Sequence, residues 1–329
     1  MKKILLINTG GTFSSVPGDD GLAPGLEIAE MAAIFGGFAD ALLQSMEFAA
    51  LDSANIMPAH WQRLAELIDD KRGEVDGIVI IHGTDTMAYT ASMLSFMCQG
   101  LAIPVVLTGS QLPVTAPLTD AVDNLRCAVA MAASGHAGVY VAFNRKVMLG
   151  CRTAKVRTVS FDAFESVNYP RIGTVNAFGL AIDAAHLPTP RMDAAFSPVY
   201  DDRIAVLKHF PGMSPRIFRS LMDEGIVGFF IEGFGLGGIP FEENSILEEI
   251  ARASKAGIPV LVGSQCRYEG ANLDVYETGQ RVQDAGGISV GDMTQEATVT
   301  KLMWALGQDV SRAHVAAVFA ENLCNEISI

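Results

Sequence analysis

The chain has 329 residues, of which 50% are hydrophobic, 18% charged and 8% aromatic. These proportions exclude a disordered, collagen-like or disulfide-dense chain, and the length predicts about two globular domains. Asp and Glu outnumber Lys and Arg by 37 to 23, which gives a formal net charge of −14. Because such a charge repels phosphate groups, it disfavours nucleic acid as a partner.

The first residues of the chain and its cysteines indicate where the protein is located in the cell and whether it binds a metal. The apolar run at residues 4–7 stops at Asn8, which is too short for a signal peptide. No stretch approaches the roughly 18 apolar residues of a membrane span. The five cysteines are widely spaced and form no Cys-x-x-Cys pair, so we expect reduced core thiols rather than disulfides or zinc. We therefore expect a soluble, cytoplasmic protein without a bound metal or a membrane partner.

Short β-branched runs alternate along the chain with segments of helical periodicity. The expected strands are residues 3–8, 77–81, 105–108, 138–143, 227–231 and 259–262. The expected helices are residues 58–70, 88–99, 119–133, 215–223 and 245–255. This alternation is typical of an α/β fold with mainly parallel sheets.

The alternation lapses between His186 and Arg203, where three prolines occur and no helical period is found. We interpret residues 188–203 as a linker. It would join a larger N-terminal α/β catalytic domain, residues 1–187, to a smaller C-terminal α/β domain, residues 204–329. Ligands of such folds bind at the carboxyl ends of strands, so the residues just after each strand are the place to look for a site.

Polar residues follow the first two long strands. Gly10 and Gly11 can turn main-chain amides toward a ligand, and Thr12 adds a hydroxyl, without the lysine of a phosphate-binding loop. After residues 77–81 come His82 to Thr86, of which a helix cap explains one polar side chain. Two threonines around Asp85 are the arrangement expected of a nucleophile with a charged partner. His82 has no second His or Cys at ligand spacing, so it does not predict a metal site.

Three other segments admit two interpretations. The amides near Ser110 could form an oxyanion hole or an ordinary turn before Pro113. Lys155 could be a surface lysine or a buried lysine beside a hydroxyl. Residues 233–238 fit Gly-x-Gly-x-x-Gly, but Ile239–Pro240 interrupts the helix that a dinucleotide site needs, so we expect no such cofactor.

Taken together, Thr9–Gly–Gly–Thr12 and Gly77-x-x-x-x-His82–Gly–Thr–Asp–Thr–Met87 resemble the two signatures of the asparaginase/glutaminase family. Further matches in order and spacing are Asp52–Ser53, Thr108–Gly–Ser–Gln111, Asp120-x-x-Asp–Asn–Leu125, Arg152–Thr-x-Lys155, Phe161–Asp–Ala–Phe164 and Asp292–Met–Thr-x-Glu–Ala297. The resemblance spans nearly the whole chain. With Ser264–Gln–Cys266, it is closest to the cytoplasmic type I branch.

The resemblance implies an L-asparagine amidohydrolase that needs no cofactor, with possible minor glutaminase activity. Thr12 would attack the side-chain amide to form an acyl-threonine, and Thr84, Asp85 and Lys155 would form a second charged triad. It further implies a homodimer or homotetramer whose sites are completed by the neighbour's C-terminal domain. The implied substrate-binding residues are Gly11, Asp52, Ser53, Thr84, Asp85 and Ser110, with Ser53 on the α-carboxylate and Asp85 on the α-ammonium.

Two departures from the family pattern stand out. The loop after Thr12 lacks the tyrosine that relatives carry, and Leu22 occupies the aligned position. Ala54 stands where relatives offer the substrate a polar side chain. Two other functions share these motifs: a non-catalytic amino-acid-binding protein, and the amidase subunit of a tRNA-dependent amidotransferase. The acidic charge and the early position of Thr9 speak against the amidase subunit, and the intact Lys155 speaks against the binding protein.

Overall fold

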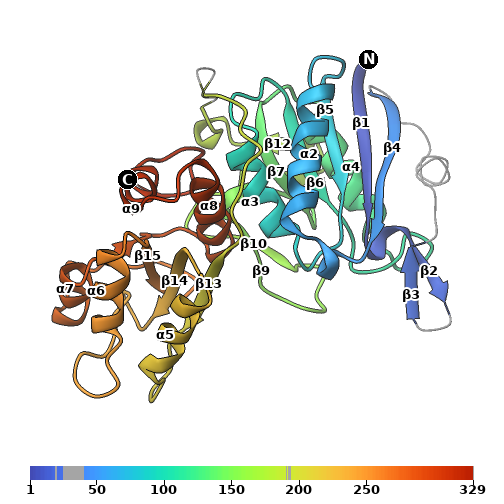
Figure 1. The fold of residues 1–329 in the computed structure, drawn as a ribbon. Coiled ribbons are helices and arrows are strands. Elements are labelled where there is room, and N and C mark those ends of the chain that lie inside the picture. Colours follow the sequence, from blue (N-terminus) through green and yellow to red (C-terminus); the bar gives the residue numbers. More distant parts are fainter. Residues whose placement is uncertain (19–20, 25–40, 190, 192–193, 329) are drawn as a thin grey trace. The chain divides into compact units, whose positions relative to one another are not determined.

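The computed structural model describes residues 1–18, 21–24, 41–189, 191 and 194–328, and only the backbone of residues 14–18 and 21–24. The chain divides into two compact units, Met1–Pro198 and Val199–Ile329 (Figure 1). Each unit contains a sheet with parallel strands and helices, which confirms the predicted α/β class.

An eight-stranded sheet forms the centre of the first unit, in the order β12-β11-β8-β7-β6-β5-β1-β4. Its strands are β1 (Lys2–Gly10), β4 (Ala41–Leu51), β5 (Gly77–Ile81), β6 (Pro104–Thr108), β7 (Gly138–Phe143), β8 (Lys146–Leu149), β11 (Gly173–Asn176) and β12 (Gly179–Ile182). Strands β4, β1, β5, β6 and β7 are parallel to one another. Strands β8, β11 and β12 extend the sheet in antiparallel fashion, an arm that the sequence did not predict.

Shorter elements complete the first unit. Two antiparallel pairs are β2 (Ser15–Gly18) with β3 (Gly21–Pro24), and β9 (Thr153–Lys155) with β10 (Phe164–Ser166). The helices are α2 (Pro58–Lys71), α3 (Met87–Met97) and α4 (Ala121–Ala132), and the 3-10 turns are η1 (Thr12–Ser14), η2 (Ser53–Asn55), η3 (Gly150–Arg152) and η4 (Ala184–His186). Strand β5 is buried along its whole length, and α3 is buried on nearly every side, as expected of a helix that is apolar all round.

The second unit has a four-stranded parallel sheet in the order β13-β14-β15-β16. Its strands are β13 (Ile204–Lys208), β14 (Gly228–Gly233), β15 (Val260–Ser264) and β16 (Ile288–Ser289). Its helices are α5 (Pro215–Asp223), α6 (Leu247–Lys255), α7 (Glu277–Asp284), α8 (Gln295–Gln308) and α9 (Arg312–Phe319). Its hydrophobic core is formed by side chains from the sheet and from the helices that pack on it. Within this core, Phe218 of α5 stacks on Phe229 of β14 with ring centroids 4.1 Å apart.

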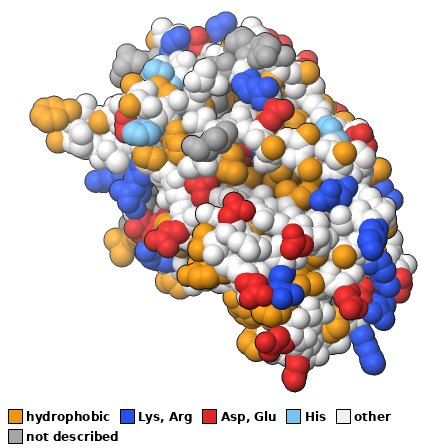
Figure 2. All heavy atoms as spheres, turned by 90° about the vertical axis from the view of Figure 1, so that its left-hand side faces the viewer, with side chains coloured by type: hydrophobic (Ala, Val, Ile, Leu, Met, Phe, Trp, Pro, Cys, Tyr) orange, Lys and Arg blue, Asp and Glu red, His pale blue; other side chains and the backbone are white. Residues whose placement is uncertain are grey.

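All six expected strands and all five expected helices are present, with ends within two residues of the predicted ones. The expectation of core thiols is right for Cys98, Cys127 and Cys151, but Cys266 is exposed. Every helix among the described residues is too short or too polar to cross a lipid bilayer. Acidic and basic side chains are both spread over the face in Figure 2, so this face does not present charge of a single sign.

Candidate active site

The loops that follow β1 and β5 are in close contact at Gly11 of the first loop and Gly83 of the second. Gly10 and Gly11 have positive φ angles of 99° and 86°, which a residue with a side chain rarely adopts. A Cβ on Gly11 would lie 2.4 Å from the Cα of Gly83, so only glycine permits this approach. Thr12, the predicted nucleophile, follows directly in η1, and the carbonyl of Phe13 accepts from the amide of Val114 at 3.1 Å. The turn that carries Thr12 is thereby tied to both neighbouring loops.

Ser53 is packed against the loop after β5. Its side chain is 4% exposed, its hydroxyl accepts from the amide of Asp85 at 3.3 Å, and its carbonyl accepts from the hydroxyl of Thr86 at 2.8 Å. Asp52 instead caps η2, because its carboxylate accepts from the amide of Ala54 at 2.8 Å. Ser53 is therefore joined to the charged loop, whereas Asp52 makes a local turn.

The structure brings three of the predicted catalytic residues together. The ammonium group of Lys155 donates to the Thr84 hydroxyl at 2.8 Å and to the Asp85 carboxylate at 2.6 Å. Thr84 is 7% exposed, and the side chains of Lys155 and Asp85 are 18% and 65% exposed. Lys155 is thus the partly buried lysine beside a hydroxyl, rather than a free surface lysine. The cation reaches this point from β9, which lies outside the eight-stranded sheet.

The polar residues after β5 do not cap α3 with their side chains. Thr86 occupies the N-cap position, but no side-chain hydrogen bond caps the helix there, and its hydroxyl is bound to the Ser53 carbonyl. Asp85 pairs with Lys155. The capping interpretation of this loop is therefore wrong, because both side chains bind residues outside α3.

The loop after β6 is organised by a carboxylate. Asp120 accepts from the amides of Gln111 and Leu112 at 3.0 and 3.1 Å and from the side chain of Asn124 at 2.9 Å. Asn124 also donates to the carbonyl of Gly109 at 2.9 Å. The hydroxyl of Ser110 turns away to the carbonyl of Leu112, which leaves the main chain of Ser110 as the part of this residue that can face a ligand.

Gln111 is a site residue that our sequence analysis did not single out. Its side-chain carbonyl accepts from the Thr84 hydroxyl at 3.4 Å, and its amide nitrogen donates to the carbonyls of Thr158 and Ser160, both at 3.1 Å. Its only signal in the sequence is its place in the motif at residues 108–111.

His82 is buried and neutral beside this site. Burial lowers its pKa to about 4, although the hydrogen bond to Gly83 acts in the opposite direction. Its Nδ1 lies 2.7 Å from the carbonyl of Gly83, so Nδ1 carries the proton and Nε2 accepts from the Thr90 hydroxyl at 2.9 Å. Thr90 in turn accepts from Trp61 at 2.9 Å. Both ring nitrogens are engaged, and among the described residues no three His, Cys, Asp or Glu side chains group as a metal site.

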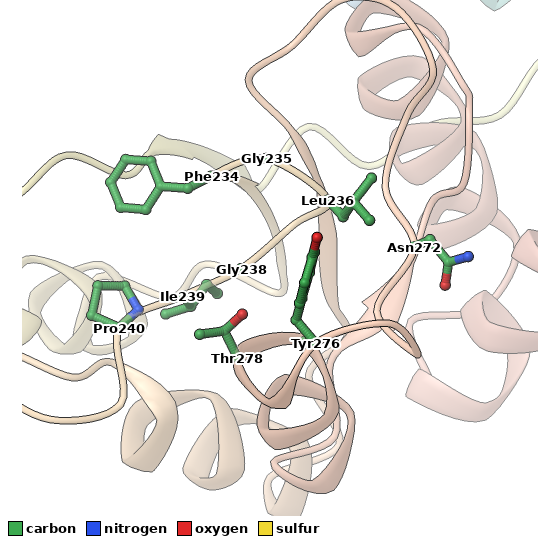
Figure 3. Close-up of a pocket in the computed structure, with 10 residues that line it drawn as sticks. Phe234, Gly235, Leu236, Gly238, Ile239, Pro240, Asn272, Tyr276 and Thr278 are labelled. Carbon is green, nitrogen blue, oxygen red and sulfur yellow. The ribbon is translucent and has the colours of Figure 1, made fainter.

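The second unit has a cavity of about 300 Å³ beside the Gly-x-Gly-x-x-Gly segment. Residues 234–246 contain no helix, and Phe234 and Gly238 pair in a tight turn, so the segment lacks the helix N-terminus of a dinucleotide site. Figure 3 shows Tyr276 projecting toward Leu236, with Phe234 and Pro240 on the other side of the cavity. The described residues that line the cavity are mainly apolar, and none of them is charged.

The predicted residue at Leu22 lies in β3, where the structure gives the backbone alone. It pairs with Pro17 across the β2–β3 hairpin. Its side chain, with those of Ser14 and Ser15, lies outside the described residues.

Comparison with known proteins identifies the family and the fold. Residues 3–186 match the model of the N-terminal asparaginase domain, and residues 203–319 match that of the glutaminase/asparaginase C-terminal domain. The chain therefore belongs to the asparaginase family, whose members are hydrolases that act on amides. This confirms the family inferred from the sequence motifs.

Individual relatives agree with this assignment. The chain is 39% identical to the L-asparaginase of Thermococcus kodakarensis over 99% of both chains. The solved structure of the thermostable L-asparaginase from that organism matches with a TM-score of 0.92 at 38% identity and 99% coverage of each chain. L-asparaginase I from Vibrio cholerae matches with a TM-score of 0.91 at 32% identity, covering 100% of this chain and 99% of that one. One subunit of the glutamyl-tRNA(Gln) amidotransferase of Pyrococcus abyssi is 34% identical over 100% of this chain and 77% of its own.

Proposed function

We propose that the protein hydrolyses L-asparagine to L-aspartate and ammonia through an acyl-enzyme on Thr12. The observation that carries this proposal is the contact of the Lys155 ammonium with both Thr84 and Asp85 beside the loop that bears Thr12. A hydroxyl is a weak acid at neutral pH, and the lysine 2.8 Å from Thr84 gives the Thr84 hydroxyl a partner for proton exchange beside the loop that bears Thr12. The full-length match to an L-asparaginase supports the choice of substrate.

In the first step, the Thr12 oxygen would attack the side-chain amide carbon of asparagine. A C–O bond forms, and the hydroxyl proton passes through a base to the amide nitrogen. The C–N bond then breaks, ammonia leaves, and a β-aspartyl ester remains on Thr12. The main chain of Ser110 and the amides around Gly11 would face the carbonyl oxygen, where negative charge develops.

In the second step, water would add to the ester carbon. Thr84 would relay a proton from the water to Lys155, which must be in its neutral amine form for this step, and the C–O bond to Thr12 would break as the Thr12 oxygen regains that proton. Asp85, whose side chain is 65% exposed, would also bind the substrate α-ammonium. The hydroxyl of Ser53 would bind the α-carboxylate, with Asp52 holding the turn from which Ser53 projects.

The absence of the family's tyrosine at Leu22 leaves the base for Thr12 to another group. We propose that Ser14, Ser15 or a bound water takes this place. If one of these groups suffices, Leu22→Tyr should leave turnover unchanged, whereas a rise in turnover would show that the missing phenol limits the first step and that the wild-type activity is weak for this reason.

The test is ammonia release from L-asparagine and L-glutamine by the wild type, Thr12→Ala and Lys155→Met. We expect both variants to lose about 100-fold or more in turnover. Lys71→Met is the matched control, since Lys71 is also ion-paired and its side chain is 25% exposed. A quenched reaction with asparagine should add one aspartyl group to the peptide that contains Thr12, and an adduct on a different residue would exclude Thr12 as the nucleophile.

Two alternative functions predict other results. A folded wild type that shows a thermal shift with asparagine but releases no ammonia would be a binding protein. An amidotransferase subunit would require tRNA, which the net charge of −14 disfavours. Glutamine differs from asparagine by one methylene, which a pocket discriminates by only roughly 1–3 kcal/mol, so minor glutaminase activity belongs to the proposal.

We also propose a homodimer or homotetramer located in the cytoplasm, as the family resemblance implies. Light scattering coupled to size-exclusion chromatography measures the assembly, and cell fractionation measures the location. A monomer with full activity would contradict a site completed by a neighbouring protomer.

A further inference from the structure

We propose that Gln111 is a positioning residue that aims the hydroxyl proton of Thr84, so that a lone pair of this oxygen faces Lys155. The inference rests on the proposed function, because it assigns Gln111 a role in the proton exchange between Thr84 and Lys155. It goes beyond the Thr84–Asp85–Lys155 triad by adding the group that sets the triad's donor and acceptor directions.

The orientation of the Gln111 amide follows from its partners. The carbonyls of Thr158 and Ser160 each lie 3.1 Å from one terminal atom of the amide. Carbonyl oxygens accept hydrogen bonds and cannot donate them, so this atom must be the nitrogen, whose two hydrogens serve both acceptors. The remaining atom, the carbonyl oxygen, therefore faces Thr84.

The direction of the Thr84 proton follows in turn. The hydroxyl has one hydrogen and lies between an acceptor, the Gln111 oxygen at 3.4 Å, and a donor, the Lys155 ammonium at 2.8 Å. Its hydrogen must point to Gln111, and its lone pair must accept from Lys155. The longer contact is weak, so it selects the direction of the proton while costing little to break when the proton has to move.

Gln111 is itself held rigidly at one end. Its backbone amide donates to both carboxylate oxygens of Asp120 at 3.0 Å. Its side chain then bridges to residues 158–160, the segment that begins three residues after Lys155. One glutamine therefore links the loop after β6, the loop after β5 and the segment after β9, which are the three parts that meet at Thr84.

Two variants of equal length separate positioning from mere support of the loop. Gln111→Met removes the acceptor for Thr84, and we expect a fall in kcat of about tenfold with KM within about twofold. Gln111→Glu keeps an acceptor for Thr84 but adds negative charge near Lys155. Both variants lose the donors to Thr158 and Ser160, so a kcat closer to wild type in Gln111→Glu than in Gln111→Met isolates the acceptor for Thr84 from support of the loop. The added charge also favours the ammonium form of Lys155 and should shift the pH-rate profile of Gln111→Glu to higher pH.

The matched control is Gln99→Met, which removes a half-buried glutamine that donates to the carbonyl of Phe96 at the far end of α3. It should leave kcat and the pH profile unchanged. Wild-type kcat and pH profile in both Gln111 variants would overturn the inference, as would a loss confined to KM. If Gln111→Met fails to fold, Gln111→Leu takes its place in the comparison of kcat with Gln111→Glu. A wild type that releases no ammonia would instead refute the proposed function, and this inference with it.

Discussion

Removal of one partner from a buried ion pair in the second unit should destabilise the fold measurably. The side chains of Lys301 and Glu326 are both fully buried, with Nζ and Oε1 2.5 Å apart. Lys301 also donates to the carbonyl of Glu321 at 2.8 Å. Glu326 accepts from the amides of Leu323 and Cys324 at 2.8 to 3.1 Å. Burial opposes the charge of Glu326, but Lys301 and these amides outweigh it and hold its pKa below the usual 4.5.

Glu326→Gln keeps an acceptor for the two amides but leaves the Lys301 ammonium buried without a counter-charge. Removal of one partner from such a pair costs about 3–5 kcal/mol. Lys301→Met should cost less, because the carboxylate keeps its amide donors and can take up a proton. The double variant has no buried charge left, so it should lose less than about 2 kcal/mol, well below the sum of the single changes.

The two tryptophans of the chain supply the assay. Trp304 lies in α8 near Lys301 and is 7% exposed, whereas Trp61 lies in the first unit. Urea unfolding in a Trp61→Phe background follows the second unit by fluorescence. The difference between wild type and Glu326→Gln should be complete above about pH 5 and shrink as Glu326 is protonated below pH 4.5. A loss under about 1 kcal/mol at pH 7 would refute the reasoning.

Three further predictions concern the first unit. Gly11→Ala should abolish ammonia release because its Cβ would meet Gly83 at 2.4 Å, whereas Gly135→Ala, with a similar φ of 78° but open space around it, should keep full activity. Since His82 has a folded pKa of about 4 against 6.5 when exposed, protons bind the unfolded chain first. His82 should therefore account for a loss of about 1.6 kcal/mol of unfolding free energy between pH 6.5 and 5, measured by urea titration as the difference in pH dependence between the wild type and His82→Gln. Asp120→Ala removes the acceptor of two loop amides and should lower kcat/KM about tenfold in the ammonia assay.

The elements that the sequence predicted well carry strong local signals. Strand β5 is a run of Ile and Val buried on both faces, which is the pattern of a central parallel strand. Helix α5 begins where predicted because Ser214 caps the amide of Arg216 and Pro215 fixes the first turn. In both cases the local preference and the final environment agree.

Strand β4 was not predicted because its local preference points the other way. Residues 41–51 are rich in Ala, Leu, Gln, Met and Glu, which favour helices. The segment is nevertheless a strand, since it pairs in parallel with β1 at the edge of the sheet and stays largely exposed. Tertiary pairing has overridden propensity here, and a single sequence does not reveal that partner.

Some site residues could be found from the sequence by the rule that ligands bind at the carboxyl ends of parallel strands. That rule works only for strands that the sequence itself reveals. Thr12, Thr84 and Ser110 follow parallel strands that were predicted and were accessible to that rule, whereas Ser53 follows β4, which was not predicted, and was named through the family resemblance. For Lys155 the residues left two interpretations open and only the family resemblance assigned it a catalytic role, because it lies on β9 in a separate two-stranded sheet.

The chain reaches β9 through a reversal that the sequence signals weakly. Strands β7 and β8 are joined by the two-residue turn Asn144–Arg145, with φ angles of 48° and 61°. Such a turn usually contains glycine, and Arg145 gives no hint of it. This reversal ends the parallel run and begins the segment that leads through η3 to Lys155. The ammonium group of Lys155 distinguishes this site from an ordinary ligand loop. Its position thus depends on the antiparallel arm, which is the part of the first unit that is hardest to predict from the sequence.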